Sequence, residues 1–230
     1  MKQLVRIFIL PSSPLFNLDK LKPFENFSPI FSSMLYTTSY SNLIEVFSNP
    51  GYDLGVYPLL HFYDDGLIED EFIPTDIISN LKLVDSERLN ISKLFHGLDF
   101  QNNISIFTFS DTIGYNKQTI YKMVELLKNE DDVLVMARNN NGSITHFGMN
   151  GRPIYFFSIS EMSDLDSALK SELALNRFIY LLEGINPIRT FSDFKELYRL
   201  LSIKENFYFC SLEIHKQFNN LFIEFKEMLK

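Results

Sequence analysis

The chain has 230 residues, of which 46% are hydrophobic and 22% are charged, so it is long enough for one buried core and has the composition of a globular protein. Its formal charge of −8 argues against a nucleic-acid partner, because an acidic surface repels polyphosphate. No apolar stretch approaches the roughly 20 residues of a membrane span, and the single cysteine, Cys210, excludes an intramolecular disulfide, so we expect a cytoplasmic protein.

Apolar runs and amphipathic stretches alternate along most of the chain. The first predicted elements are a strand at 4–10 and a helix at 28–42; residues 43–47 either continue this helix or form a short strand. Strands at 54–63 and 104–109, a helix starting near 116, and strands at 131–137, 144–149 and 154–158 come next. Helices at 164–183, 190–201 and 211–230 complete the chain order. The first strand stops at Pro11, which is too early for a signal peptide. Residues 67–103 are polar and irregular, and we expect short strands and a lid-like excursion there.

Cap and turn residues mark several of the predicted boundaries. Ser28 and Pro29 are typical of a helix N-cap and of the first helical position. Pro58 indicates that its strand lies at a sheet edge or carries a bulge. Gly184 is expected to end the helix before it, and the residues at 190–193 predict a capping box for the next helix.

Strands that alternate with helices and long crossovers predict a doubly wound α/β fold. Its sheet would be mixed but mostly parallel, with helices on both faces. No repeat or low-complexity linker divides the chain, so we expect residues 1–230 to form a single domain. Within that domain, residues 160–230 would form a helical C-terminal flank.

Asp111, which follows the strand at 104–109, is the strongest candidate for a functional residue. Open α/β sheets place polar chemistry at the carboxyl ends of buried strands. A carboxylate there could hold Mg²⁺ or Mn²⁺, which in turn would neutralise a diphosphate. The alternative is a structural Asp that caps the following turn. Two carboxylates separated by one residue would be a stronger signal for a metal site, but residue 109 is Phe.

Other polar residues are weaker candidates. Ser12 and Ser13 follow the first strand, where hydroxyl and N–H groups can meet a base or a phosphate, although their loop lacks the glycines of a phosphate-binding loop. Lys22 either reaches a phosphate as a point charge or is a solvated surface side chain. His146 has no partner at ligand spacing and Cys210 lies in an apolar run, so a structural role is predicted for both.

Three parts of the chain resemble the nucleotide-diphospho-sugar transferase superfamily, which has the GT-A fold. Residues 20–24 (KLKPF) and 28–30 (SPI) are similar to the Lys-Pro and small-residue-Pro pairs before the first helix of sugar nucleotidyltransferases. Residues 107–114 and the helix after them look like the strand that ends in a metal- or sugar-binding Asp. Residues 188–194 (IRTFSDF) are similar to the segment Asp-Ile-Asp-Thr-Pro-Glu-Asp-Leu near the end of several bacterial members.

The resemblance implies a GT-A-like three-layer sandwich that binds a nucleotide or nucleotide sugar and carries out metal-assisted glycosyl or nucleotidyl transfer. The residues that it places in contact with ligands are Asp111 for Mg or Mn, Ser12 and Ser13 for the base and ribose, Lys22 for phosphate, and Asn141 and Gly142 for the substrate. The alternative is a non-catalytic binding or interaction protein on a diverged form of this fold. Two features favour this alternative: the acidic net charge, and a loop after the first strand that lacks paired glycines and an arginine.

The last predicted helix carries an apolar stripe, formed by Ile214, Phe218, Leu221, Phe222, Phe225 and Leu229. Such a stripe has to be covered, because burying one Phe or Leu side chain stabilises a fold by about 1.5–3 kcal/mol. We expect it to pack on its own domain and give a monomer. The alternative is a symmetric homodimer through this helix.

Overall fold

The computed structural model shows an α/β protein built on one central sheet. The residues that it describes are 5–10, 24–48, 58–64, 81–85, 103–115, 117–130, 132–139, 144–150, 167, 170–171, 174–175, 178–185, 187–203 and 209–229. The predicted strand at 154–158 and most of the irregular region at 67–103 lie outside these residues.

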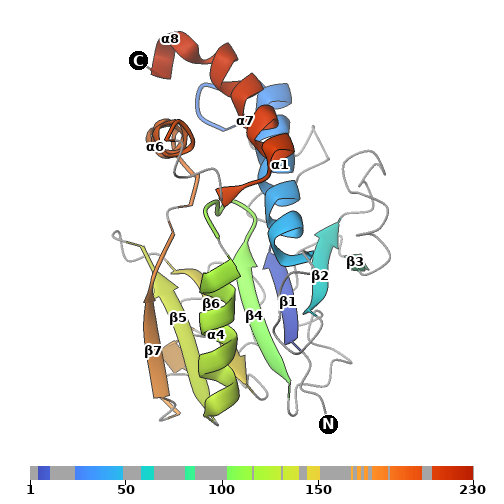
Figure 1. The fold of residues 1–230 in the computed structure, drawn as a ribbon, viewed down its shortest axis with the longest axis vertical. Helices are drawn as coiled ribbons and strands as arrows, with labels where there is room; N and C mark the ends of the chain where they lie inside the picture. Colours follow the sequence, from blue (N-terminus) through green and yellow to red (C-terminus); the bar gives the residue numbers. More distant parts are fainter. Residues whose placement is uncertain are drawn as a thin grey trace.

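The sheet has seven strands in the order β3-β2-β1-β4-β6-β5-β7 (Figure 1). The strands are, in chain order, β1 (Val5–Leu10), β2 (Pro58–Asp64), β3 (Leu81–Asp85), β4 (Ile104–Phe109), β5 (Val133–Arg138), β6 (Ile144–Asn150) and β7 (Phe178–Glu183). Of these, β6 runs antiparallel to β4 and β5, and the other neighbouring pairs are parallel. The predicted mixed but mostly parallel sheet is therefore confirmed.

The strand order reverses at β1. The chain leaves β1 through α1 (Pro29–Ser48) to β2 and β3 on one side, whereas β4 pairs with β1 on the other side. A reversal of this kind is a topological switch point, and open α/β sheets bind ligands in the crevice outside the carboxyl ends of the strands there. The fold thus predicts a ligand site where β1 and β4 end.

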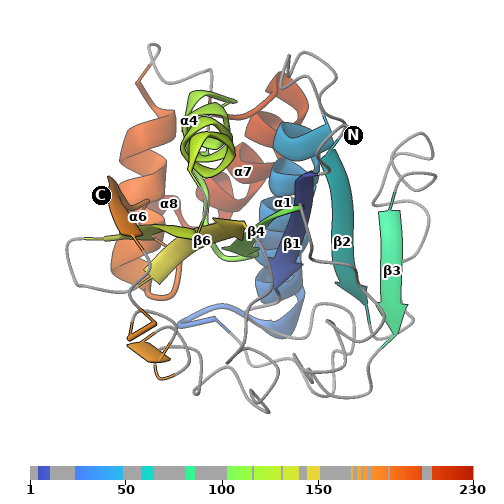
Figure 2. The same cartoon turned by 90° about the horizontal axis from the view of Figure 1, so that it is seen from below.

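Helices α1 and α4 (Lys117–Asn129) cover the same face of the sheet, and α4 lies over β4, β5 and β6 (Figure 2). Helix α4 turns one apolar face inward, with all four members of the predicted stripe fully buried: Ile120, Met123, Val124 and Leu127. They pack against alternate residues of the strands, such as Ile7 and Ile106. This face forms the main core of the protein.

A second apolar cluster lies beyond the carboxyl edge of the sheet, among α1, α6 (Phe191–Leu201), α7 (Leu212–Glu224) and the segment before α8 (Lys226–Leu229) (Figure 1). It is rich in aromatic rings: Phe27 stacks on Phe225 at 3.9 Å between centroids, and Phe194 is 0% exposed. The predicted stripe of the last helix is buried here from Ile214 to Phe225, so the expectation that it packs on its own domain is confirmed. None of the described helices is long and apolar enough to cross a membrane.

Two expectations about local structure are wrong. The helix predicted at 164–183 is a strand over Phe178–Glu183, because Tyr180 and Leu182 face the main core with the two-residue period of a strand. Residues 167, 170 and 171, earlier in the same predicted helix, are helical, so the chain passes from helix to strand within this element. Pro58 does not mark an edge strand, since β2 lies between β1 and β3. It is the first residue of β2, a position where the missing N–H is tolerated.

Candidate functional site

The loop after β4 turns sharply at the carboxyl edge of the sheet and buries its polar residues. Ser110, Asp111 and Thr112 are 3%, 4% and 0% exposed. The Thr112 N–H donates to the Phe109 carbonyl at 3.1 Å, which closes the turn. Asp111 thus lies at the carboxyl end of a buried strand, as the sequence predicted, and the strand order places it at the switch point.

The loop after β7 is joined to this turn. The Ile188 N–H donates to the Asp111 carbonyl at 2.7 Å, and Thr112 forms an antiparallel bridge with Pro187. Two segments far apart in the sequence are therefore held side by side by backbone hydrogen bonds, which fix their relative positions.

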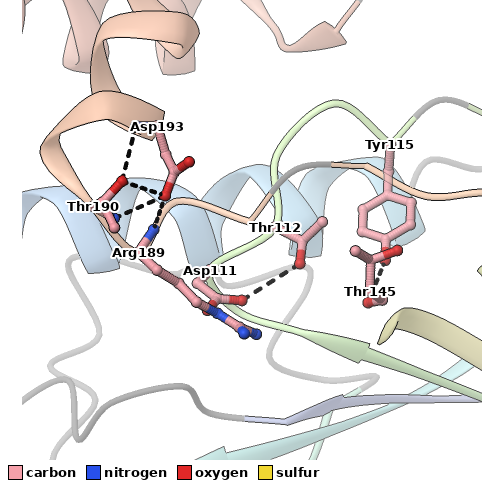
Figure 3. Close-up of polar contacts among 7 residues, drawn as sticks. All are labelled: Asp111, Thr112, Tyr115, Thr145, Arg189, Thr190 and Asp193. Carbon is pink, nitrogen blue, oxygen red and sulfur yellow. Dashed lines mark hydrogen bonds and ion pairs between the residues drawn. The ribbon is translucent and has the colours of Figure 1, made fainter. Parts of the chain in front are cut away.

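This junction brings a cation to Asp111. The Nε atom of Arg189 lies 2.8 Å from Oδ2 of Asp111, whose side chain is 3% exposed, whereas that of Arg189 is 47% exposed (Figure 3). The Thr112 hydroxyl lies 3.4 Å from the other carboxylate oxygen, Oδ1. Burial raises the pKa of the Asp111 carboxyl above its ordinary value, and the Arg189 guanidinium offsets part of that rise by favouring the charged form.

The N-terminus of α6 fixes the backbone of Arg189. Thr190 and Asp193 form the predicted capping box, and the N–H groups of Arg189 and Thr190 both donate to Oδ2 of Asp193, at 3.0 and 2.8 Å (Figure 3). The Phe191 N–H donates to Oε2 of Glu25 at 2.7 Å. A short local motif therefore positions the arginine that pairs with Asp111.

A buried polar network lies next to this loop. The Thr108 hydroxyl donates to the Tyr115 hydroxyl at 2.7 Å, and the Tyr115 hydroxyl donates to the Thr145 carbonyl at 3.0 Å. Burial raises the pKa of Tyr115, so this phenol stays neutral. His146 is 0% exposed beside Tyr115, and burial lowers its pKa to about 4. Its position in the core agrees with the structural role that its sequence context predicts.

The buried His146 makes stability depend on pH. Its folded-state pKa of about 4 lies below the ordinary value of 6.5, so between these values the unfolded chain binds a proton that the folded chain does not. The free energy of unfolding should therefore fall as pH decreases from 6.5 to 4, with a contribution on the order of 3 kcal/mol from this residue. Urea unfolding of the wild-type protein and His146→Gln at several pH values checks this, and an equally steep fall in both proteins would contradict it.

The described residues do not fit a divalent metal at Asp111. One carboxylate oxygen accepts from Arg189 and the other lies near the Thr112 hydroxyl, so a cation would have to displace the guanidinium. Within the described ranges, no group of three or more His, Cys, Asp or Glu side chains could hold a metal ion. A lone carboxylate paired with an arginine is a poor Mg²⁺ or Mn²⁺ site, because these ions need several oxygen ligands.

A hollow of about 480 Å³ lies beside the junction, between the loops after β4 and β7 and helix α6. Its lining includes the apolar residues Ile113, Ile188 and Leu197 and the acidic residues Glu183, Asp193 and Glu196. These acidic groups make the hollow unsuitable for a phosphate. The cationic side of the junction is therefore at Arg189, outside this hollow.

The structure places one of the predicted site residues, Asp111, and shows its partner. The other predicted residues, Ser12, Ser13, Lys22, Asn141 and Gly142, lie outside the described residues, and their roles stay predictions. Sequence reasoning did not identify Arg189 as a site residue. A signal was available, because residues 188–194 resemble an Asp-rich segment and Arg189 stands at one of its Asp positions.

Comparisons with solved structures show which fold this is. No protein-family model and no curated protein matches the chain. A provisionally assigned nucleotide-diphospho-sugar transferase from Desulfovibrio desulfuricans G20 superposes with a TM-score of 0.67 at 16% identity, covering 100% of this chain and 97% of that one. A 4-diphosphocytidyl-2C-methyl-D-erythritol synthase superposes with a TM-score of 0.56 at 10% identity, covering 88% and 100%.

A third similar structure is a manganese complex of a protein from Mycobacterium tuberculosis H37Rv, with a TM-score of 0.52 at 9% identity over 86% of this chain and 99% of that one. Identities this low establish the fold alone. The chain has the fold of nucleotide-diphospho-sugar transferases, as the resemblance of its sequence segments implied.

Proposed function

We propose that this chain binds a nucleotide or nucleotide sugar where β1 and β4 end, and that it acts as a nucleotidyltransferase-like or glycosyltransferase-like protein. The observation that carries the proposal is the ion pair between buried Asp111 and half-exposed Arg189 at the switch point of a sheet with the transferase fold. Transfer from such a donor develops negative charge on a leaving phosphate, and a fixed cation near that phosphate stabilises the charge.

The remaining predicted contacts complete this proposal. Ser12 and Ser13 would contact the base and ribose, Lys22 a phosphate, and Asn141 and Gly142 the substrate. A role for Mg²⁺ or Mn²⁺ at Asp111 would require Arg189 to leave the carboxylate when the donor binds. We further propose that the protein is cytoplasmic, in line with its single cysteine. We also propose that it is a monomer, because the apolar stripe of its last helix is covered within its own domain.

A non-catalytic binding protein is the second candidate. Asp111, the carboxylate that the structure places at the switch point, is engaged by Arg189 and is not available as a general base. Such a protein would bind a nucleotide without turning it over, and its helical C-terminal end would carry a partner surface.

Calorimetric titration with a panel of nucleoside triphosphates, nucleoside diphosphates and nucleotide sugars tests both candidates. We expect at least one compound to bind, and parallel titrations in EDTA and in Mn²⁺ show whether a metal contributes. No binding at millimolar concentration in either condition would overturn the proposed function. Binding without turnover of the bound donor, across a panel of phosphorylated acceptors, would favour the second candidate.

A further inference from the structure

We propose that Arg189 contacts a phosphate of the bound nucleotide directly, and that Asp111 is the residue that positions Arg189. The positive charge that stabilises the phosphate would then come from an arginine of the chain and not from a metal ion. The inference rests on the proposed function, since it concerns the same site and names how that site recognises its ligand.

The geometry leaves part of the guanidinium available to a ligand. Arg189 uses Nε for Asp111, and its terminal nitrogens have no hydrogen-bond partner within the part of the chain that the structure describes. Its side chain is 47% exposed although the carboxylate beneath it is buried. An arginine held through Nε can present its remaining N–H groups to two oxygens of one phosphate.

Both ends of Arg189 are held in place. The capping box fixes its backbone through Asp193, and Asp111 fixes its guanidinium. Asp111 is itself held by the Ile188 N–H, so the pair is anchored to the rigid edge of the sheet. A binding group held in this way loses little side-chain entropy when its ligand arrives.

At this point a guanidinium, and not a metal ion, faces the Asp111 carboxylate. The Arg189 guanidinium donates to one oxygen of the Asp111 carboxylate and the Thr112 hydroxyl lies near the other, so the oxygens that a metal would need are engaged. The exposed part of the guanidinium offers a phosphate both a positive charge and N–H donors.

Binding of inorganic pyrophosphate and of the best nucleotide from the panel, measured by calorimetry in EDTA, tests this inference. We expect both to bind the wild-type protein without metal. Arg189→Gln should weaken binding about tenfold to a hundredfold, because it removes charge-assisted hydrogen bonds to the phosphate. Arg189→Lys should lose less, because it keeps the charge without the planar fork. The matched control is Arg199→Gln on the exposed side of α6, which should bind like the wild type.

Arg189→Gln leaves a buried carboxylate unpaired and could weaken the fold, so the double variant Asp111→Asn with Arg189→Gln is the second measurement. It removes both charges, and it should stay folded by circular dichroism and show the same loss of affinity. Nucleotide binding that needs Mn²⁺ and is unchanged in either variant would overturn this inference and leave the proposed function standing. Failure of every nucleotide and of pyrophosphate to bind the wild type, with or without Mn²⁺, would overturn both.

Discussion

Gly184→Ala is expected to destabilise the protein by about 3 kcal/mol or more, because the new methyl group has no space. A Cβ atom at this position would lie 2.2 Å from the carbonyl carbon of Arg138 and 2.5 Å from the Asn139 nitrogen, both in the backbone. The Gly184 N–H also donates to the Arg138 carbonyl at 2.9 Å. The clash can be relieved only by separating β7 from β5.

The same substitution should weaken the candidate site, because the chain runs from Gly184 directly into the loop that carries Arg189. Urea unfolding measures the loss of stability, and calorimetry with the best nucleotide measures the loss of binding. Glu183→Ala, an exposed change at the preceding residue, is the control and should shift the unfolding midpoint little. An unchanged midpoint for Gly184→Ala would show that the two strands do not approach as closely as described.

Phe194→Ala is expected to cost about 3–5 kcal/mol, the usual penalty for removing a large, fully buried aromatic side chain. Phe194 is 0% exposed at the centre of the second apolar cluster, with its ring 5.0 Å from that of Phe27 and 5.2 Å from that of Phe222. The cavity left behind would loosen α6 and with it the capping box. Thermal or urea unfolding measures the effect directly.

Tyr198→Ala is the matched control, since Tyr198 lies on the same helix but is 39% exposed. It should cost about 1 kcal/mol, as expected for a substitution outside the core. Equal losses for the two variants would contradict the assignment of Phe194 to the centre of the cluster. Retained stability together with unchanged nucleotide binding in Phe194→Ala would show that α6 is anchored mainly by its cap.

Local sequence signals predicted the parts of the structure that depend on neighbouring residues. The capping box at Thr190 and Asp193, the N-cap at Ser28 and the stripes of α4 and α7 all form as expected. These features arise from side chains three or four positions apart, so they can be recognised in one stretch of sequence. The same local reasoning was wrong for Phe178–Glu183, where pairing with β5 turned an expected helix into a strand.

The sequence by itself determined the α/β class, the mostly parallel sheet and the place of Asp111 at the end of a buried strand. This was possible because the spacing of apolar residues along the chain indicates which segments form buried strands and which form amphipathic helices. Only the tertiary structure decided that Arg189 lies 2.8 Å from Asp111, since that pairing joins residues 78 positions apart. It depends on the bridge between the loops after β4 and β7, which no local pattern encodes.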